Sequence, residues 1–253
     1  MAYLDRDGVR IYYEVHGSGP AVLLSHGYSA TSAMWTGQIE ALRASHKLII
    51  WDMRGHGNSD SPVNPAEYSE ALTTGDMAAL LDEVGARTAV IGGLSLGGYM
   101  SLSFNVAFPQ RVDALMLFDT GPGYRSDAGR DGWNRIATQR AKELETKGLA
   151  ALGTSGEVTV SRHRSAQGLA HAARGMLAQT DGRVMASLPE IRVPTLVLVG
   201  ALDQPFLAAT DYMAAKIPGA TRVVIDGAGH ASNIDRPREF NAAVTKFLAQ
   251  LSR

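Results

Sequence analysis

Six short, nearly unbroken apolar runs recur along the chain, and they constrain its fold more than any other feature. They occupy residues 21–24, 48–51, 89–91, 114–118, 195–199 and 222–225. Runs of this length without polar alternation are typical of strands buried on both faces, as in parallel sheets covered by helices. Residues 9–15 alternate only in part, as an edge hairpin with one wet face would.

Helical patterns separate these runs. Apolar residues at helical spacing occur within residues 77–84 and again within 240–251. Alternating strands and helices predict a doubly wound, mostly parallel α/β sheet. The chain has 253 residues, which fits one large domain with a modest insertion.

The alternation stops between residues 121 and 188. That stretch opens with the turn signal Gly121-Pro122-Gly123 and has helical patterns but no strand-like run. We therefore expect residues 1–120 and 189–253 to form the core of the fold. Residues 121–188 are expected to form a small inserted helical cap.

A glycine-rich turn at residues 93–97, Gly-Leu-Ser-Leu-Gly, follows the third apolar run and precedes a helical pattern. A nucleophile on a sharp strand-to-helix turn needs small residues two positions before and after it, because the two backbones nearly touch. The helix N-terminus behind such a turn offers N–H groups to a developing oxyanion. This context predicts Ser95 as a nucleophile; a glycine-rich turn that merely contains a serine is the alternative.

A serine hydroxyl needs a base at neutral pH. Of seven histidines, only His230 lies in a glycine-rich loop directly after the last predicted strand. Such a loop reaches the carboxyl edge of the sheet, where ligands bind in open α/β folds. For the acid that orients the histidine, Asp203 follows the predicted strand 195–199, and Asp119 follows strand 114–118 as a rival. The order Ser95, Asp203, His230 is the one expected for this kind of fold.

The tight turn after the first buried strand, His26-Gly27-Tyr28, is the expected source of a second oxyanion donor. We expect the backbone N–H groups of Tyr28 and Leu96 to form the oxyanion hole. His26 is interpreted as a structural histidine that braces this turn.

Five motifs in this order resemble the α/β-hydrolase superfamily, and the match runs through nearly the whole chain apart from the cap. The motifs are His26-Gly27-Tyr28 and residues 52–59, 93–98, 200–203 and 229–230. In that family the segment 52–59 is usually architectural, so the resemblance implies that Asp52 and Arg54 are not catalytic. The short cap and the ending Gly-His-Ala-Ser-Asn-Ile resemble the branch of 3-oxoadipate enol-lactone hydrolases and small esterases.

The resulting prediction is a serine hydrolase, a carboxylic ester hydrolase that cleaves a small ester or lactone through an acyl-enzyme on Ser95. The alternatives are a carbon–carbon bond hydrolase or perhydrolase with the same site, or a non-enzymatic ligand receptor on the fold. Haloalkane dehalogenases and epoxide hydrolases share the fold that this chain resembles, but they use aspartate at the position of Ser95. Both activities are therefore disfavoured. Tyr28 and Trp133 are candidates to contact substrate, and further cap candidates are Arg125, Arg162, His163 and Arg164.

Several partners are not expected. The net charge is −1 and no basic run is present, which argues against a nucleic-acid partner. The chain has no cysteine and no histidine pair at metal-ligand spacing, and its glycine pairs fit no nucleotide-binding motif, so neither a metal nor a cofactor is predicted. The chain has acidic residues at its start and no apolar run long enough to span a membrane, so we expect it to be cytoplasmic. We also expect it to be a monomer or a small homo-oligomer.

Overall fold

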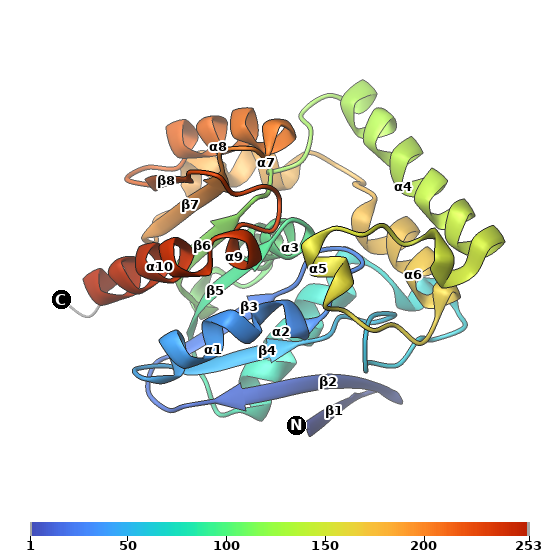
Figure 1. Ribbon diagram of the computed structural model, residues 1–253, viewed down its shortest axis with the longest axis horizontal. Coiled ribbons are helices and arrows are strands. Elements are labelled where there is room, and N and C mark those ends of the chain that lie inside the picture. The colour runs from blue at the N-terminus through green and yellow to red at the C-terminus, as the bar shows by residue number, and fades with distance from the viewer. Residues whose placement is uncertain (1, 252–253) are drawn as a thin grey trace.

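The computed structural model describes residues 2–251. Eight strands form one sheet in the order β1-β2-β4-β3-β5-β6-β7-β8 (Figure 1). Their bounds are β1 (Ala2–Arg6), β2 (Val9–His16), β3 (Ala21–Ser25), β4 (Lys47–Trp51), β5 (Ala89–Leu94), β6 (Val112–Phe118), β7 (Thr195–Gly200) and β8 (Thr221–Ile225). The pairs from β4 to β8 are parallel, while β2 pairs antiparallel with β1 and β4. The predicted mostly parallel α/β sheet is confirmed.

The helices alternate with these strands. In chain order they are η1 (Ser32–Trp35), α1 (Thr36–Arg43), η2 (Pro65–Glu67), α2 (Glu70–Glu83), α3 (Leu96–Ala107), η3 (Pro109–Arg111), α4 (Asp127–Lys147), η4 (Gly148–Ala151), α5 (Gly156–Thr159), α6 (Ala166–Ala172), the π-helical turn η5 (Ala173–Leu177), α7 (Arg183–Ser187), η6 (Leu188–Glu190), α8 (Gln204–Lys216), α9 (Ser232–Asp235) and α10 (Pro237–Leu251). Among residues 2–251, no helix is long and apolar enough to cross a membrane.

Two apolar cores lie on the two faces of the sheet. Side chains of α2, α3 and α8, such as Leu80, Met100 and Met213, pack on one face. Side chains of α1 and α10, such as Leu42 and Phe240, pack on the other. Burial on both faces explains why the central strands read as continuous apolar runs.

An N-terminal hairpin forms one edge of the sheet. β1 and β2 are joined by Asp7-Gly8, both with positive φ, the conformation that a tight two-residue hairpin turn requires. β1 is the edge strand, and β2 lies between β1 and β4. The β1–β2 hairpin thus lies at the edge of the sheet, as the partial alternation of residues 9–15 predicts, with β1 outermost.

Only helices occur between β6 and β7, in agreement with the expected break in the alternation. Helices α4 to α6 lie together to one side of the sheet (Figure 1). Here α4 packs against α6 through Ala141, Leu144 and Leu169. That residues 121–188 form an inserted cap stays a proposal.

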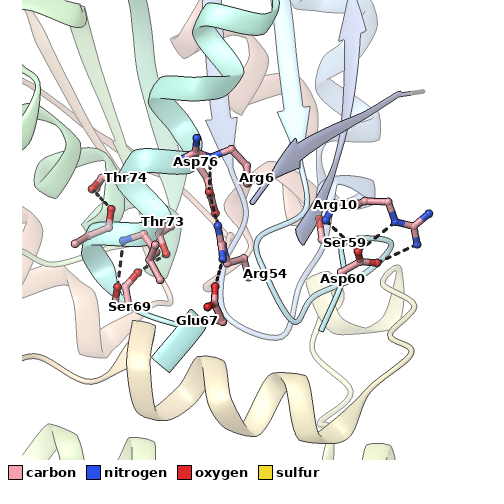
Figure 2. A network of polar contacts seen from close by, with 12 residues as sticks. Arg6, Arg10, Arg54, Ser59, Asp60, Glu67, Ser69, Thr73, Thr74 and Asp76 are labelled. Carbon is pink, nitrogen blue, oxygen red and sulfur yellow. Dashed lines mark hydrogen bonds and ion pairs between the residues drawn. The ribbon is translucent and has the colours of Figure 1, made fainter. Parts of the chain in front are cut away.

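A buried ion-pair network fixes the loop after β4 (Figure 2). Arg54 is 3% exposed and contacts both carboxylate oxygens of Asp76 in α2, at 2.7 and 2.9 Å, and Glu67 at 2.9 Å. Arg6 of β1 also donates to Asp76, at 3.2 Å. The network joins β1, the loop and α2, so Arg54 is architectural, as the resemblance implies.

Candidate active site

Ser95 occupies the sharp turn between β5 and α3. Its φ and ψ of 56° and −116° are a strained backbone conformation for a residue with a side chain. A Cβ on Gly93 would collide with the backbone of Gly97, and a Cβ on Gly97 with the carbonyl oxygen of Ser25. Strand and helix therefore approach each other as closely as the glycine pattern predicts.

His230 and Asp203 meet at the carboxyl edge of the sheet. The Nδ1 atom of His230 lies 2.8 Å from Oδ2 of Asp203, whose side chain is 5% exposed, while the histidine is 32% exposed. With an ionised Asp203, Nδ1 carries the ring hydrogen and Nε2 is left as the basic nitrogen. Phe206 stacks on the imidazole at a centroid distance of 5.0 Å. Among residues 2–251, no hydrogen bond joins the Ser95 hydroxyl to His230. Catalytic hydrogen bonds are often long or poorly aligned in substrate-free enzymes.

The surroundings of His230 favour its charged form. Burial opposes this, but the hydrogen bond and charge of Asp203 outweigh it, and the charges of Asp119 and Glu157 add to them. The pKa of His230 is therefore raised above its ordinary value. Such surroundings suit a base that must accept a proton during a reaction.

Asp119, the rival acid, does not touch the imidazole. It is fully buried, and its carboxylate accepts hydrogen bonds from the Gly200 N–H at 2.8 Å and from the Ser232 hydroxyl. These contacts favour Asp203 as the partner of His230, whereas Asp119 contacts the start of the Asp203 loop and the residue two positions after His230.

The loop after β3 runs beside the nucleophile. A Cβ on Gly27 would lie 3.4 Å from the Cβ of Ser95, so the peptide of Gly27 and Tyr28 passes close to the reactive side chain. Leu96 is the first residue of α3. The Tyr28 hydroxyl donates to the carbonyl of Leu169 in α6 at 2.9 Å, which holds this loop against the helical segment.

A cleft of about 620 Å³ opens between this loop and α4. Tyr28 and Ser29 form one wall, and Arg135, Ile136 and Arg140 lie on the other. These three residues of α4 were missed from the sequence, because the exposed face of an amphipathic helix carries no signal of what lies opposite it.

The other cap candidates make internal contacts. The indole N–H of Trp133 donates to the Leu177 carbonyl at 2.7 Å, and Trp133 does not line the cleft. Arg164 donates to backbone carbonyls of the loop after β4, including Gly57 at 3.1 Å. Arg162 donates to its neighbouring carbonyls, and no side-chain hydrogen bond of Arg125 occurs among residues 2–251.

Three histidines cluster beside Tyr28 and Ser29, the two residues of the loop after β3 that line the cleft. His26 is fully buried and braces its turn, because its Nε2 accepts the Met53 N–H at 2.9 Å and its Nδ1 lies 2.7 Å from the Gly27 carbonyl. His56 lies 4.9 Å from His26 and 5.9 Å from His163 by ring centroids. His163 of the helical segment contacts the Ser29 carbonyl at 2.9 Å.

Asp52 is buried and holds the same region through backbone N–H groups. It accepts from Ser32 at 2.7 Å and from Asn58 at 2.8 Å. Its contacts are architectural, in agreement with the sequence interpretation. Within residues 2–251, no group of three or more acidic or histidine side chains is arranged to hold a metal ion.

The sequence and the fold match proteins of known class. The model of the alpha/beta hydrolase family matches residues 22–243, and the chain belongs to this family. A relative from Bacillus subtilis, provisionally named a 2-succinyl-6-hydroxy-2,4-cyclohexadiene-1-carboxylate synthase, is 30% identical, with 97% of each chain covered. The 3-oxoadipate enol-lactonase 2 of Acinetobacter baylyi is 29% identical over 95% of this chain and 94% of its own.

A thermophilic esterase from Thermogutta terrifontis has a similar structure. It is 28% identical, with a TM-score of 0.82 over 98% of this chain and 97% of the esterase chain. Together these matches make the protein a hydrolase of the branch that holds enol-lactonases and esterases.

Proposed function

We propose that the protein cleaves a small carboxylic ester or lactone through an acyl-enzyme on Ser95, with His230 as base and Asp203 as the orienting acid. The observation that carries the proposal is the 2.8 Å contact between His230 and Asp203 at the sheet edge where Ser95 ends β5 in a strained turn. Nucleophile, base and orienting acid at one edge of a parallel sheet are the parts that acyl transfer needs.

The reaction proceeds in two steps. Nε2 of His230 takes the hydroxyl proton as Ser95 attacks the carbonyl carbon, and the oxyanion is stabilised by the N–H groups of Tyr28 and Leu96. His230 then gives the proton to the leaving alkoxide. In the second step His230 activates water, which releases the acid and restores Ser95. Each oxyanion donor contributes about 3 kcal/mol of transition-state stabilisation.

Activity should depend on pH through His230. Only the neutral imidazole can act as base, so the rate falls as the pH drops through the pKa of His230. Because Asp203 raises that pKa against the effect of burial, the acid limb should lie above the ordinary histidine value of about 6.5.

The residues that line the cleft include neither Ser95 nor His230; the cleft adjoins the proposed site through Tyr28, whose peptide with Gly27 passes close to Ser95. A substrate that extends from Ser95 into the cleft should be small and acidic. Arg135 and Arg140 line the cleft, and neither pairs with a carboxylate within 4.0 Å among residues 2–251. Glu143 also lines the cleft but accepts a hydrogen bond from Gln139 at 3.0 Å. Guanidinium groups in such a place bind carboxylates well. An ester with a terminal carboxylate should therefore have a lower KM than its uncharged analogue, and Arg140→Gln should reduce the difference.

The decisive experiment measures hydrolysis of short-chain p-nitrophenyl esters and several lactones by the wild type and Ser95→Ala. Ser18→Ala, at an exposed serine, is the matched control. We expect turnover in the wild type and control, and none above background in Ser95→Ala. Equal turnover in all three proteins would refute the assignment of Ser95. Absence of turnover in all three would instead favour carbon–carbon bond hydrolysis, tested with a vinylogous diketone, or a ligand receptor.

A further inference from the structure

The end of β6 contacts the loops of all three proposed triad residues. The Ser95 N–H donates to the Phe118 carbonyl at 3.0 Å. The Thr120 hydroxyl donates to the Ser95 carbonyl at 2.6 Å. Residues on either side of Asp119 therefore hold both backbone polar groups of the nucleophile.

Asp119 itself joins the other two loops. Its carboxylate accepts the N–H of Gly200 at 2.8 Å and the hydroxyl of Ser232. Gly200 precedes Asp203 by three residues, and Ser232 follows His230 by two. One side chain thus fixes the start of the acid loop relative to the base loop.

The conformation of Asp119 is costly in two ways. Its φ is +45°, a left-handed value that a residue with a side chain adopts only where its surroundings enforce it. It is also a fully buried carboxylate whose hydrogen-bond donors, Gly200 and Ser232, are both neutral. Burying a carboxylate without a cationic partner is unfavourable. Such a feature in a native protein calls for a functional reason.

The charges of His230 and Asp203 both act on Asp119. Burial raises the pKa of Asp119 to about 7, against the hydrogen bonds from Ser232 and Gly200 and the charge of His230, while the charge of Asp203 raises it further. His230 in turn is acted on by Asp203, Asp119 and Glu157. Asp119 is therefore ionised mainly above about pH 7, and the positive charge that acts on it is that of His230.

We propose that Asp119 is a positioning residue of the triad: it fixes the loops of Asp203 and His230 relative to Ser95, and in its ionised form its charge supports the imidazolium formed during catalysis. This inference rests on the proposed function. A merely structural aspartate would lower stability without changing kcat or the pH profile of the folded enzyme.

Three variants separate the charge from the hydrogen bond. Asp119→Asn keeps the shape and an acceptor oxygen but removes the charge. Ser232→Ala keeps the charge but removes one donor, and Ser232→Thr restores a hydroxyl. Each is assayed for kcat, KM and the pH profile of kcat/KM on the best p-nitrophenyl ester, after thermal unfolding has shown that it is folded.

For Asp119→Asn we expect kcat to fall about 10-fold to 100-fold with KM within about 2-fold, and the acid limb to move to lower pH because a negative charge near His230 is lost. Ser232→Ala should lower kcat less and leave the acid limb in place, and Ser232→Thr should recover activity. A folded Asp119→Asn with unchanged kcat and pH profile would overturn the proposal.

If Asp119→Asn does not fold, the Ser232 pair decides: unchanged kcat in Ser232→Ala would refute the positioning role. Failure of the proposed function is a separate result, because Ser95→Ala would then retain activity whatever the Asp119 variant does.

Discussion

At the scale of single residues, close backbone contacts determine what the elbow around Ser95 can tolerate. The carbonyl oxygen of Ser25 in β3 lies where a Cβ of Gly97 would have to be. This oxygen belongs to the backbone of a central strand, so it cannot rotate away as a side chain would. The geometry of the nucleophile thus depends on the absence of side-chain atoms as much as on Ser95 itself.

Gly97→Ala should therefore both destabilise the fold and misplace Ser95. We expect a loss of about 1–3 kcal/mol in the free energy of unfolding, as for overpacked sites, and a fall in kcat. The measurements are urea denaturation and p-nitrophenyl ester hydrolysis. Gly153→Ala, where an added Cβ would meet no atom within 4 Å, is the control for urea denaturation alone, because Gly153 lines the cleft; it should change stability by less than about 0.5 kcal/mol. Equal effects of the two substitutions on stability would contradict this account.

At the scale of elements, the sequence predicted β3 to β7, because burial on both faces leaves a strong local signal, and the helical segment. It also predicted β8, an edge strand that is exposed at Thr221 and Arg222. β1 was not predicted: Ala2–Arg6 has charged residues and becomes a strand only by pairing with β2. The proposed triad residues could be named from the sequence because each follows a predicted strand, and the structure places these strand ends at one edge of the sheet. Phe206 and Arg140 could not, since their proximity to His230 and to the cleft arises from tertiary packing. The cytoplasmic location and the monomer or small oligomer stay predictions.

The buried ion pair between Arg54 and Asp76 should contribute strongly to the stability of the fold, because it joins the loop after β4 to α2. Arg54→Met would leave the fully buried carboxylate of Asp76 with only Arg6 as a cationic partner. Removal of one member of a buried pair costs about 3–5 kcal/mol, and urea denaturation should show a loss of this size. Arg10→Met breaks the exposed pair with Asp60 and should cost much less, because solvent screens an exposed ion pair. Similar losses for the two variants would show that the buried ion pair contributes no more to the free energy of unfolding than the exposed one.

At the scale of the whole molecule, the cluster of His26, His56 and His163 joins the sheet domain to the helical segment. Burial lowers the pKa of all three. For His56 the charges of His26 and His163 lower it further, and its Nε2 is buried without a hydrogen-bond partner among residues 2–251. The charge of Asp52 acts in the opposite direction on His26 and His163. A neutral cluster is therefore part of the native packing.

This cluster should make the fold sensitive to acid. The unfolded chain binds protons at its histidines near pH 6.5, whereas the buried rings resist protonation until lower pH, so stability is present above about pH 6.5 and is lost as the pH falls toward the folded pKa values. Asp119 and His230 have raised pKa values, so they make the folded state more stable as the pH falls. Because they contribute equally in the wild type and in a His56→Asn variant, their contribution cancels when the two proteins are compared. The free energy of unfolding, measured by urea denaturation from pH 7.5 to 5, should therefore fall less steeply in His56→Asn. The expected difference in slope is up to about 1.4 kcal/mol per pH unit for one proton. Parallel curves would show that His56 is not a source of the acid sensitivity, and a steeper curve for the variant would reverse the sign of its contribution.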